Sequence, residues 1–231
     1  MQQSPLFIRK TLAWGVHLFT ASGAVWGFLA LLAVFHHEWK SAFLWMTLAM
    51  LVDGLDGLLA RKFDVKTYAD GLDGALLDNI LDYFNYVIVP ALFLIEADIL
   101  PAPFRLAAAA AILLSSAYQF TQTNAKTEDH YFTGFPSYWN VAVIYMLVLE
   151  LDPRINLFFI ILFNILVFVP TKWLYPTRGT RLTLFLTYFY GAIGITGILL
   201  YPHEPQWLWP LSLTYSLYYI ALSLWPRRVT T

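Results

Sequence analysis

Four aspartates stand in two segments that otherwise read as apolar helix. Asp53 and Asp56 lie three residues apart in the stretch VDGLDGLLAR, and Asp78 and Asp82 lie four apart in GALLDNILD. Both spacings put the two carboxylates on one face of a helix. Carboxylates gathered in apolar surroundings repel one another, so a cation has to offset their charge. Oxygen ligands of this kind favour Mg²⁺ or Mn²⁺, and two such ions can bind and activate a diphosphate.

Small residues accompany the acids. Gly57 and Ala60 follow on the first segment and Gly74 precedes on the second, which would let a bulky nucleotide approach the backbone. The other acids of the region lie in the connection and are interpreted as solvated caps: Asp64, Asp70 and Asp73.

The composition indicates which environment surrounds these acids. The 231 residues are 59% hydrophobic, with a mean hydropathy of +0.60, which is far above the usual apolar content of soluble domains. Aromatic residues make up 18% of the chain and include nine Trp, which suits the interfaces of a bilayer. Cysteine is absent, so disulfides and thiolate metal sites are excluded. The sequence therefore predicts an all-α, polytopic membrane protein.

Windows of about 20 apolar residues predict the membrane spans. Eight such windows are found, which puts both termini on one side of the membrane. They cover residues 12–35, 41–60, 73–96, 103–121, 137–151, 155–172, 180–201 and 206–226.

The basic residues predict which side that is. Three of them fall on one side of the predicted membrane: Lys40, Arg105 and Arg154. The other eleven fall on the opposite side: Arg9, Lys10, Arg61, Lys62, Lys66, Lys126, Lys172, Arg178, Arg181, Arg227 and Arg228. Lys and Arg are enriched in cytoplasmic loops, so both termini and the loop 61–72 are predicted to be cytoplasmic, with the four acids at the cytoplasmic half of their spans.

The motif as a whole resembles the signature of the CDP-alcohol phosphatidyltransferases. It reads Asp53-x2-Asp56-Gly57-x2-Ala60-Arg61-x12-Gly74-x3-Asp78-x3-Asp82. The gap of twelve residues is longer than in the common form of the signature and resembles the bacterial phosphatidylcholine synthases. The segments VHLFTASG, AKTEDHYFTGFPSYWN and VPTKWLYPTR are similar to that subfamily too. This resemblance covers most of the chain, suits eight spans, and implies one integral membrane domain over residues 1–231 with its catalytic helix-loop-helix at 41–96.

The resemblance implies a role for each matched residue. Asp53, Asp56 and Asp78 would ligate two metal ions, and Asp82 would share that ligation and act as general base on the acceptor hydroxyl. The residues expected to hold CDP-diacylglycerol are Gly57, Ala60, Arg61, Gly74, Thr20, Ser22, Lys126 and Arg178. For Thr20 and Ser22, and for His17 beside them, ordinary interhelical hydrogen bonding is an equal alternative. For Lys126 and Arg178 the alternative is a purely topogenic charge.

The resemblance, more than the aromatic residues themselves, implies choline as the acceptor alcohol. Aromatic faces beside a carboxylate bind quaternary ammonium groups, and such residues gather on the predicted cytoplasmic side. The predicted choline-binding residues are Tyr83, Tyr86, Tyr118, Glu128, Tyr138 and Trp139. An interfacial aromatic belt is the alternative explanation of the same rings.

The expected activity is therefore transfer of a phosphatidyl group from CDP-diacylglycerol to choline with release of CMP. Alternatives are a related transferase that uses another small alcohol such as serine, and a cation transporter whose intramembrane acids bind the transported ion. The expected setting is the inner membrane, with the active site facing the cytoplasm, a homodimer, and no nucleic-acid partner.

Overall fold

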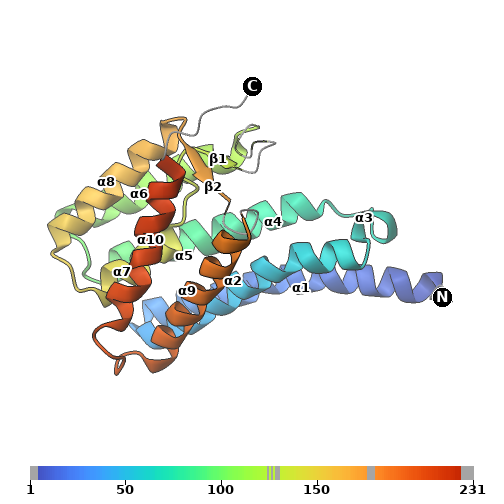
Figure 1. Cartoon of the computed structure of the whole chain (residues 1–231), viewed down its shortest axis with the longest axis horizontal. Helices are drawn as coiled ribbons and strands as arrows, with labels where there is room; N and C mark the ends of the chain where they lie inside the picture. Colours follow the sequence, from blue (N-terminus) through green and yellow to red (C-terminus); the bar gives the residue numbers. More distant parts are fainter. Residues whose placement is uncertain (1–4, 124, 126, 128–130, 176–179, 225–231) are drawn as a thin grey trace. The chain divides into compact units, whose positions relative to one another are not determined.

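The computed structural model describes residues 5–123, 125, 127, 131–175 and 180–224, and most of them lie in helices (Figure 1). The chain divides into two units, Met1–Val89 and Pro90–Thr231, which are described in turn.

The first unit begins with two long helices that pack side by side (Figure 1). These are α1 (Leu6–Phe35) and α2 (Trp39–Lys62). The chain reverses between them in three residues because His37 takes a left-handed backbone conformation, with φ of 57°. This pairing brings Thr20 of α1 to the same pocket as Asp53 and Asp56 of α2.

A connection between α2 and the second acidic helix contains the short helix α3 (Val65–Tyr68). Helix α3 packs on α1 through an apolar cluster of Ala13, Val16, Val65 and Ala69. The next helix, α4 (Gly74–Tyr83), is capped by Asp73, whose carboxylate accepts hydrogen bonds from two backbone amides at 3.0 Å. The interpretation of Asp73 as a cap is thus confirmed.

The helix that carries Asp78 and Asp82 changes its winding directly after them. It continues as a π-helical turn, η1 (Phe84–Ile88), and then as α5 (Val89–Glu96). Such turns insert an extra residue, are rare, and are frequent at functional sites. Two glycines of α1, Gly23 and Gly27, leave space for the π-helical turn η1. The Asn85 amide donates to the Gly23 carbonyl at 3.3 Å, and a methyl group on Gly27 would collide with Asn85 and Phe84.

After α5, the described part of the second unit contains five longer helices and a small sheet that was not predicted. The helices are α6 (Arg105–Thr121), α7 (Trp139–Val148), α8 (Pro153–Phe168), α9 (Arg181–Leu200) and α10 (Leu208–Leu224), and a 3₁₀ turn, η2 (Ala102–Phe104), precedes α6. Helix α6 packs on α8, and α9 packs on α10. The sheet pairs β1 (Tyr131–Thr133) antiparallel with β2 (Lys172–Leu174).

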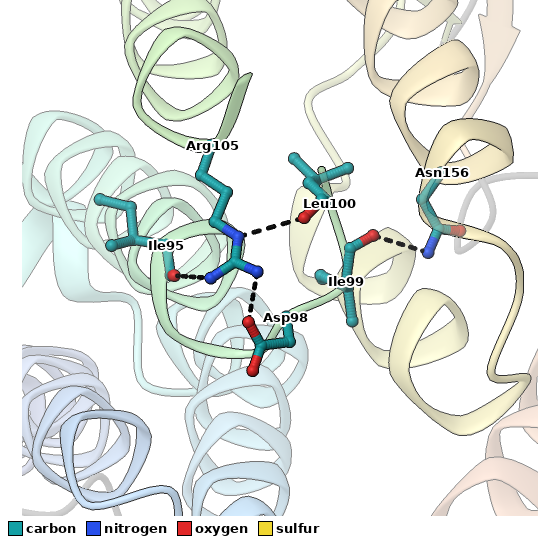
Figure 2. A network of polar contacts seen from close by, with 6 residues as sticks. All are labelled: Ile95, Asp98, Ile99, Leu100, Arg105 and Asn156. Atoms are coloured by element: carbon teal, nitrogen blue, oxygen red, sulfur yellow. Dashed lines mark hydrogen bonds and ion pairs between the residues drawn. The ribbon is translucent and has the colours of Figure 1, made fainter. Parts of the chain in front are cut away.

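A network of polar contacts holds the connection between α5 and α6 (Figure 2). The Arg105 guanidinium donates to the carbonyl oxygens of Leu100 at 3.1 Å and Ile95 at 3.5 Å, and it pairs with the Asp98 carboxylate. The Asn156 amide donates to the Ile99 carbonyl at 3.0 Å. Arg105, one of the three basic residues predicted to lie on the side with fewer positive charges, therefore also fixes the fold of this connection.

The helices confirm a membrane protein but not the number of spans. Each predicted span coincides with a helix. Among the described residues, four helices are long and apolar enough to cross a bilayer: Leu6–Phe35, Trp39–Lys62, Gly74–Glu96 and Arg181–Leu200. Large apolar side chains such as Phe7, Leu18, Leu106 and Leu114 are 73–79% exposed, as expected where lipid rather than water surrounds the helices. The count of eight stays a prediction, since α7 and α8 have only 10 and 16 residues.

Candidate active site

Three of the four predicted metal ligands converge from two helices. One carboxylate oxygen from each of Asp53 on α2, and Asp78 and Asp82 on α4, lie within 4.8 Å of one another. All three side chains are half-buried. Asp56 is outside this group but lines the same pocket, as does Thr20 of α1.

This arrangement suits a divalent metal ion. The ligand oxygens of Asp53, Asp78 and Asp82 lie within 4.8 Å of one another, and ionised carboxylates this close tolerate each other only with a proton or a cation between them. The ligand atoms are all carboxylate oxygens, the donors that Mg²⁺ and Mn²⁺ prefer. The residues present therefore fit such an ion.

The pocket around the acids is built by three helical elements of the first unit. Helix α1 contributes Thr20 and Gly23, α2 contributes Ala49 and Val52 with its two aspartates, and the α4–η1 helix contributes Leu81, Asn85 and Tyr86 with the other two. Most of its lining is apolar apart from the acids, so charge is concentrated in one place.

The predicted nucleotide residues fall into different settings. A methyl group on Gly57 would meet only the Arg61 guanidinium, at 3.4 Å, so the backbone there is open and the exposed Arg61 lies over it. Ala60 instead packs against the apolar cluster between α1 and α3. The Ser22 hydroxyl donates to the Phe19 carbonyl of its own helix at 2.6 Å, which satisfies it without a ligand.

Gly74 has a packing reason for its small size. A methyl group there would lie 3.1 Å from the ring of His17, which is buried and has its Nε2 3.4 Å from the Ala69 carbonyl oxygen. His17 thus sits between the loop before α4 and the first residue of that helix. The contact links α1 to the start of the helix that carries Asp78 and Asp82.

The predicted choline residues are divided between the two units. Tyr86 lines the acidic pocket, and Tyr83 is half-buried on α4. In the second unit, Tyr118 is exposed on α6, Tyr138 contacts the ring of Phe132, and Trp139 is fully buried with its indole N–H bonded to Ser116 at 2.8 Å. Three predicted site residues lie outside the described part of the chain: Lys126, Glu128 and Arg178.

Sequence reasoning missed two contributors to this pocket. One is Asn85, whose amide oxygen is buried and has no hydrogen-bond partner among the described residues. The other is Gly23, which with Gly27 forms a Gly-x3-Gly pattern on α1 that admits the π-helical turn. The signals that could have revealed them are a polar residue inside an apolar span and a small-x3-small motif of helix packing.

Comparison with known proteins agrees with the chemistry of this pocket. The profile of the CDP-alcohol phosphatidyltransferase family matches residues 16–196. A phosphatidylcholine synthase of Legionella pneumophila is 41% identical over 223 residues, which cover 92% of this chain and 88% of that protein. The phosphatidylcholine synthase of Pseudomonas aeruginosa is 39% identical, with 94% of this chain and 93% of that protein covered. That of Rhizobium meliloti is 36% identical, with 85% and 83% covered. A match over most of the chain, joined to an acidic pocket built by the motif itself, means that the chain belongs to the CDP-alcohol phosphatidyltransferase family.

Proposed function

We propose that the protein transfers the phosphatidyl group of CDP-diacylglycerol to choline and releases CMP. The observation that carries the proposal is the convergence of Asp53, Asp78 and Asp82 from two helices, with ligand oxygens within 4.8 Å of one another. The similarity to phosphatidylcholine synthases over most of the chain supports choline as the acceptor. The family is one of enzymes, which argues against the cation transporter.

In this proposal the four acids hold two divalent ions, Mg²⁺ or Mn²⁺. When bound, the ions would neutralise the diphosphate of CDP-diacylglycerol. Asp82 is proposed to take the proton of the choline hydroxyl, which is supported by its place in the carboxylate group and in the lining of the same pocket. The choline oxygen then bonds to the lipid-bearing phosphorus, the bond from that phosphorus to the CMP oxygen breaks, and CMP leaves with the electron pair.

Different residues are proposed to contact the two substrates. Gly57, with the Arg61 guanidinium above it, offers an open backbone and a positive charge for the nucleotide. Thr20, Ser22, Ala60, Gly74, Lys126 and Arg178 are proposed as further contacts of CDP-diacylglycerol. Tyr83, Tyr118, Glu128, Tyr138 and Trp139 are proposed for choline, with Tyr86 treated separately below.

The larger setting is also a proposal. The eight predicted spans coincide with helices, and the excess of Lys and Arg on one side supports cytoplasmic termini and a cytoplasmic active site in the inner membrane. Residues 1–231 would form one catalytic membrane domain centred on the helix-loop-helix 41–96, acting as a homodimer.

One assay tests the function directly. Purified protein in detergent is given CDP-diacylglycerol, Mn²⁺ and one alcohol at a time, and CMP release is measured for choline, ethanolamine, serine and inositol. Choline should be used far better than the others. CMP release with serine as fast as with choline would reject the choline assignment, while absence of CMP release with every alcohol would reject the proposed transfer reaction.

A further inference from the structure

We infer that Tyr86 is a positioning residue of the metal site, which acts through its hydroxyl on Asp53; the inference rests on the proposed function. The Tyr86 hydroxyl donates to Oδ2 of Asp53 at 2.7 Å, between the π-helical turn η1 and helix α2. Both side chains are half-buried and line the pocket of the acids. A hydrogen bond from a hydroxyl to a carboxylate at this distance is of the strong, charge-assisted kind.

The backbone holds Tyr86 in the orientation that this bond requires. Its neighbour Asn85 is only 8% exposed, donates to the Gly23 carbonyl, and fills the space that Gly27 leaves on α1. Because Asn85 is anchored to α1, the π-helical turn cannot rotate freely, and the direction of the next side chain is set. The Tyr86 hydroxyl is thus presented to Asp53 by packing.

The hydrogen bond constrains the carboxylate that would bind the metal. A carboxylate whose oxygen accepts from a fixed donor loses its freedom to rotate, so the bond from Tyr86 holds Asp53 in its place beside Asp78 and Asp82. Partners that orient metal ligands in this way typically account for about 10–100-fold in metal affinity. This role uses the hydroxyl of Tyr86, whereas the choline role predicted from the sequence uses the face of its ring.

The substitution Tyr86→Phe separates the two roles, because it removes the hydroxyl and keeps the ring. Mn²⁺ binding to the detergent-solubilised protein is measured without substrate from the electron paramagnetic resonance signal of free Mn²⁺, and CMP release is measured against Mn²⁺ concentration. We expect the dissociation constant and the activating Mn²⁺ concentration to rise about 10–100-fold. The rate should recover at saturating Mn²⁺, and the choline KM should not change.

Tyr68→Phe is the matched control. Tyr68 lies in the same unit, and its hydroxyl also takes part in a hydrogen bond, accepting from Arg9 at 2.6 Å, but it lies outside the acidic pocket. Tyr68→Phe should leave Mn²⁺ affinity unchanged.

Three results would overturn the inference. These are unchanged Mn²⁺ affinity in Tyr86→Phe, a raised choline KM with unchanged Mn²⁺ affinity, or a loss of helical circular dichroism in Tyr86→Phe alone, which would indicate a structural role. The binding measurement needs no alcohol and no lipid. A wild-type protein that binds Mn²⁺ tightly but releases no CMP would therefore contradict the proposed function and leave the role of Tyr86 standing.

Discussion

The clustered aspartates of the first unit differ from its other polar side chains in the charge that they bring together. The Ser22 hydroxyl, for example, is satisfied by its own helix. The three converging carboxylates, in contrast, bring ligand oxygens within 4.8 Å of one another. Excess charge in apolar surroundings is costly unless a cation binds, so these acids are the part of the site that depends most on a ligand.

Replacing an acid of the cluster should therefore remove activity rather than the fold. We expect Asp53→Ala, Asp78→Ala and Asp82→Ala each to lower CMP release on the order of 100-fold or more, since metal ions contribute several kcal/mol to charge stabilisation. Asp70→Ala is the control, because Asp70 is exposed in the loop before α4. Full activity of Asp78→Ala at saturating Mn²⁺ would contradict the metal site.

The aromatic residues allow a second prediction at this scale. A desolvated cation over a ring is worth roughly 2 kcal/mol, so losing a ring that holds trimethylammonium should raise the choline KM about tenfold or more. Tyr83→Leu, Tyr118→Leu and Tyr138→Leu test this, with the KM for CDP-diacylglycerol as internal control. If all three keep the wild-type choline KM, these rings do not hold choline. Trp139 is unsuitable for the test, because it is fully buried and its truncation would leave a cavity.

Among the elements, α1 and η1 contact each other at the pocket of the acids. The Gly-x3-Gly pattern at Gly23 and Gly27 lets Asn85 and Phe84 approach the backbone of α1. Close approach at small residues is a principal way in which membrane helices pack, because lipid and side chains are equally apolar. The element that orients Tyr86 is therefore positioned by two residues that carry no functional group.

Adding a methyl group at this Gly-x3-Gly pattern should weaken the packing of α1 against η1. Gly27→Ala places its Cβ against Asn85 and the Phe84 ring, whereas Gly15→Ala on the same helix meets no atom within 4 Å. We expect Gly27→Ala to lower the free energy of unfolding by about 1–3 kcal/mol, as overpacking does, and to reduce activity. Gly15→Ala should not destabilise the protein. Equal stability of the two variants in denaturant-induced unfolding would show that position 27 tolerates a side chain.

For the whole molecule, the distribution of Lys and Arg predicts its orientation in the bilayer. The chain has no cysteine, so single cysteines can report sidedness without further changes. Cysteines introduced at Lys66 and Arg228 should be shielded from an impermeant thiol reagent in intact cells, whereas one at Glu204 should react. The reason is the excess of Lys and Arg predicted to be cytoplasmic. Labelling at position 66 but not at 204 would invert the map and put the acids on the opposite side.

The sequence by itself was sufficient to predict the class of protein and the four aspartates that line one pocket. Mean hydropathy depends only on composition and apolar run length only on the order of residues, and together they predicted a membrane protein whose helices coincide with the expected spans. The carboxylate spacings of 3 and 4 residues also predicted shared helix faces correctly, because helix geometry is local. The profile match then confirmed the family that the motif resembles.

Tertiary structure decided what depends on contacts between distant residues. The extra residue of η1 has no periodic signature, since it exists because Asn85 and Phe84 fit against glycines about 60 positions earlier in the chain. The pairing of β1 with β2 joins strands of three residues, which are too short to show an alternating pattern. The hydrogen bond from Tyr86 to Asp53 spans 33 residues. From the sequence, Tyr86 could be interpreted only as an aromatic ring, because the packing of three helices is what positions its hydroxyl beside the acids.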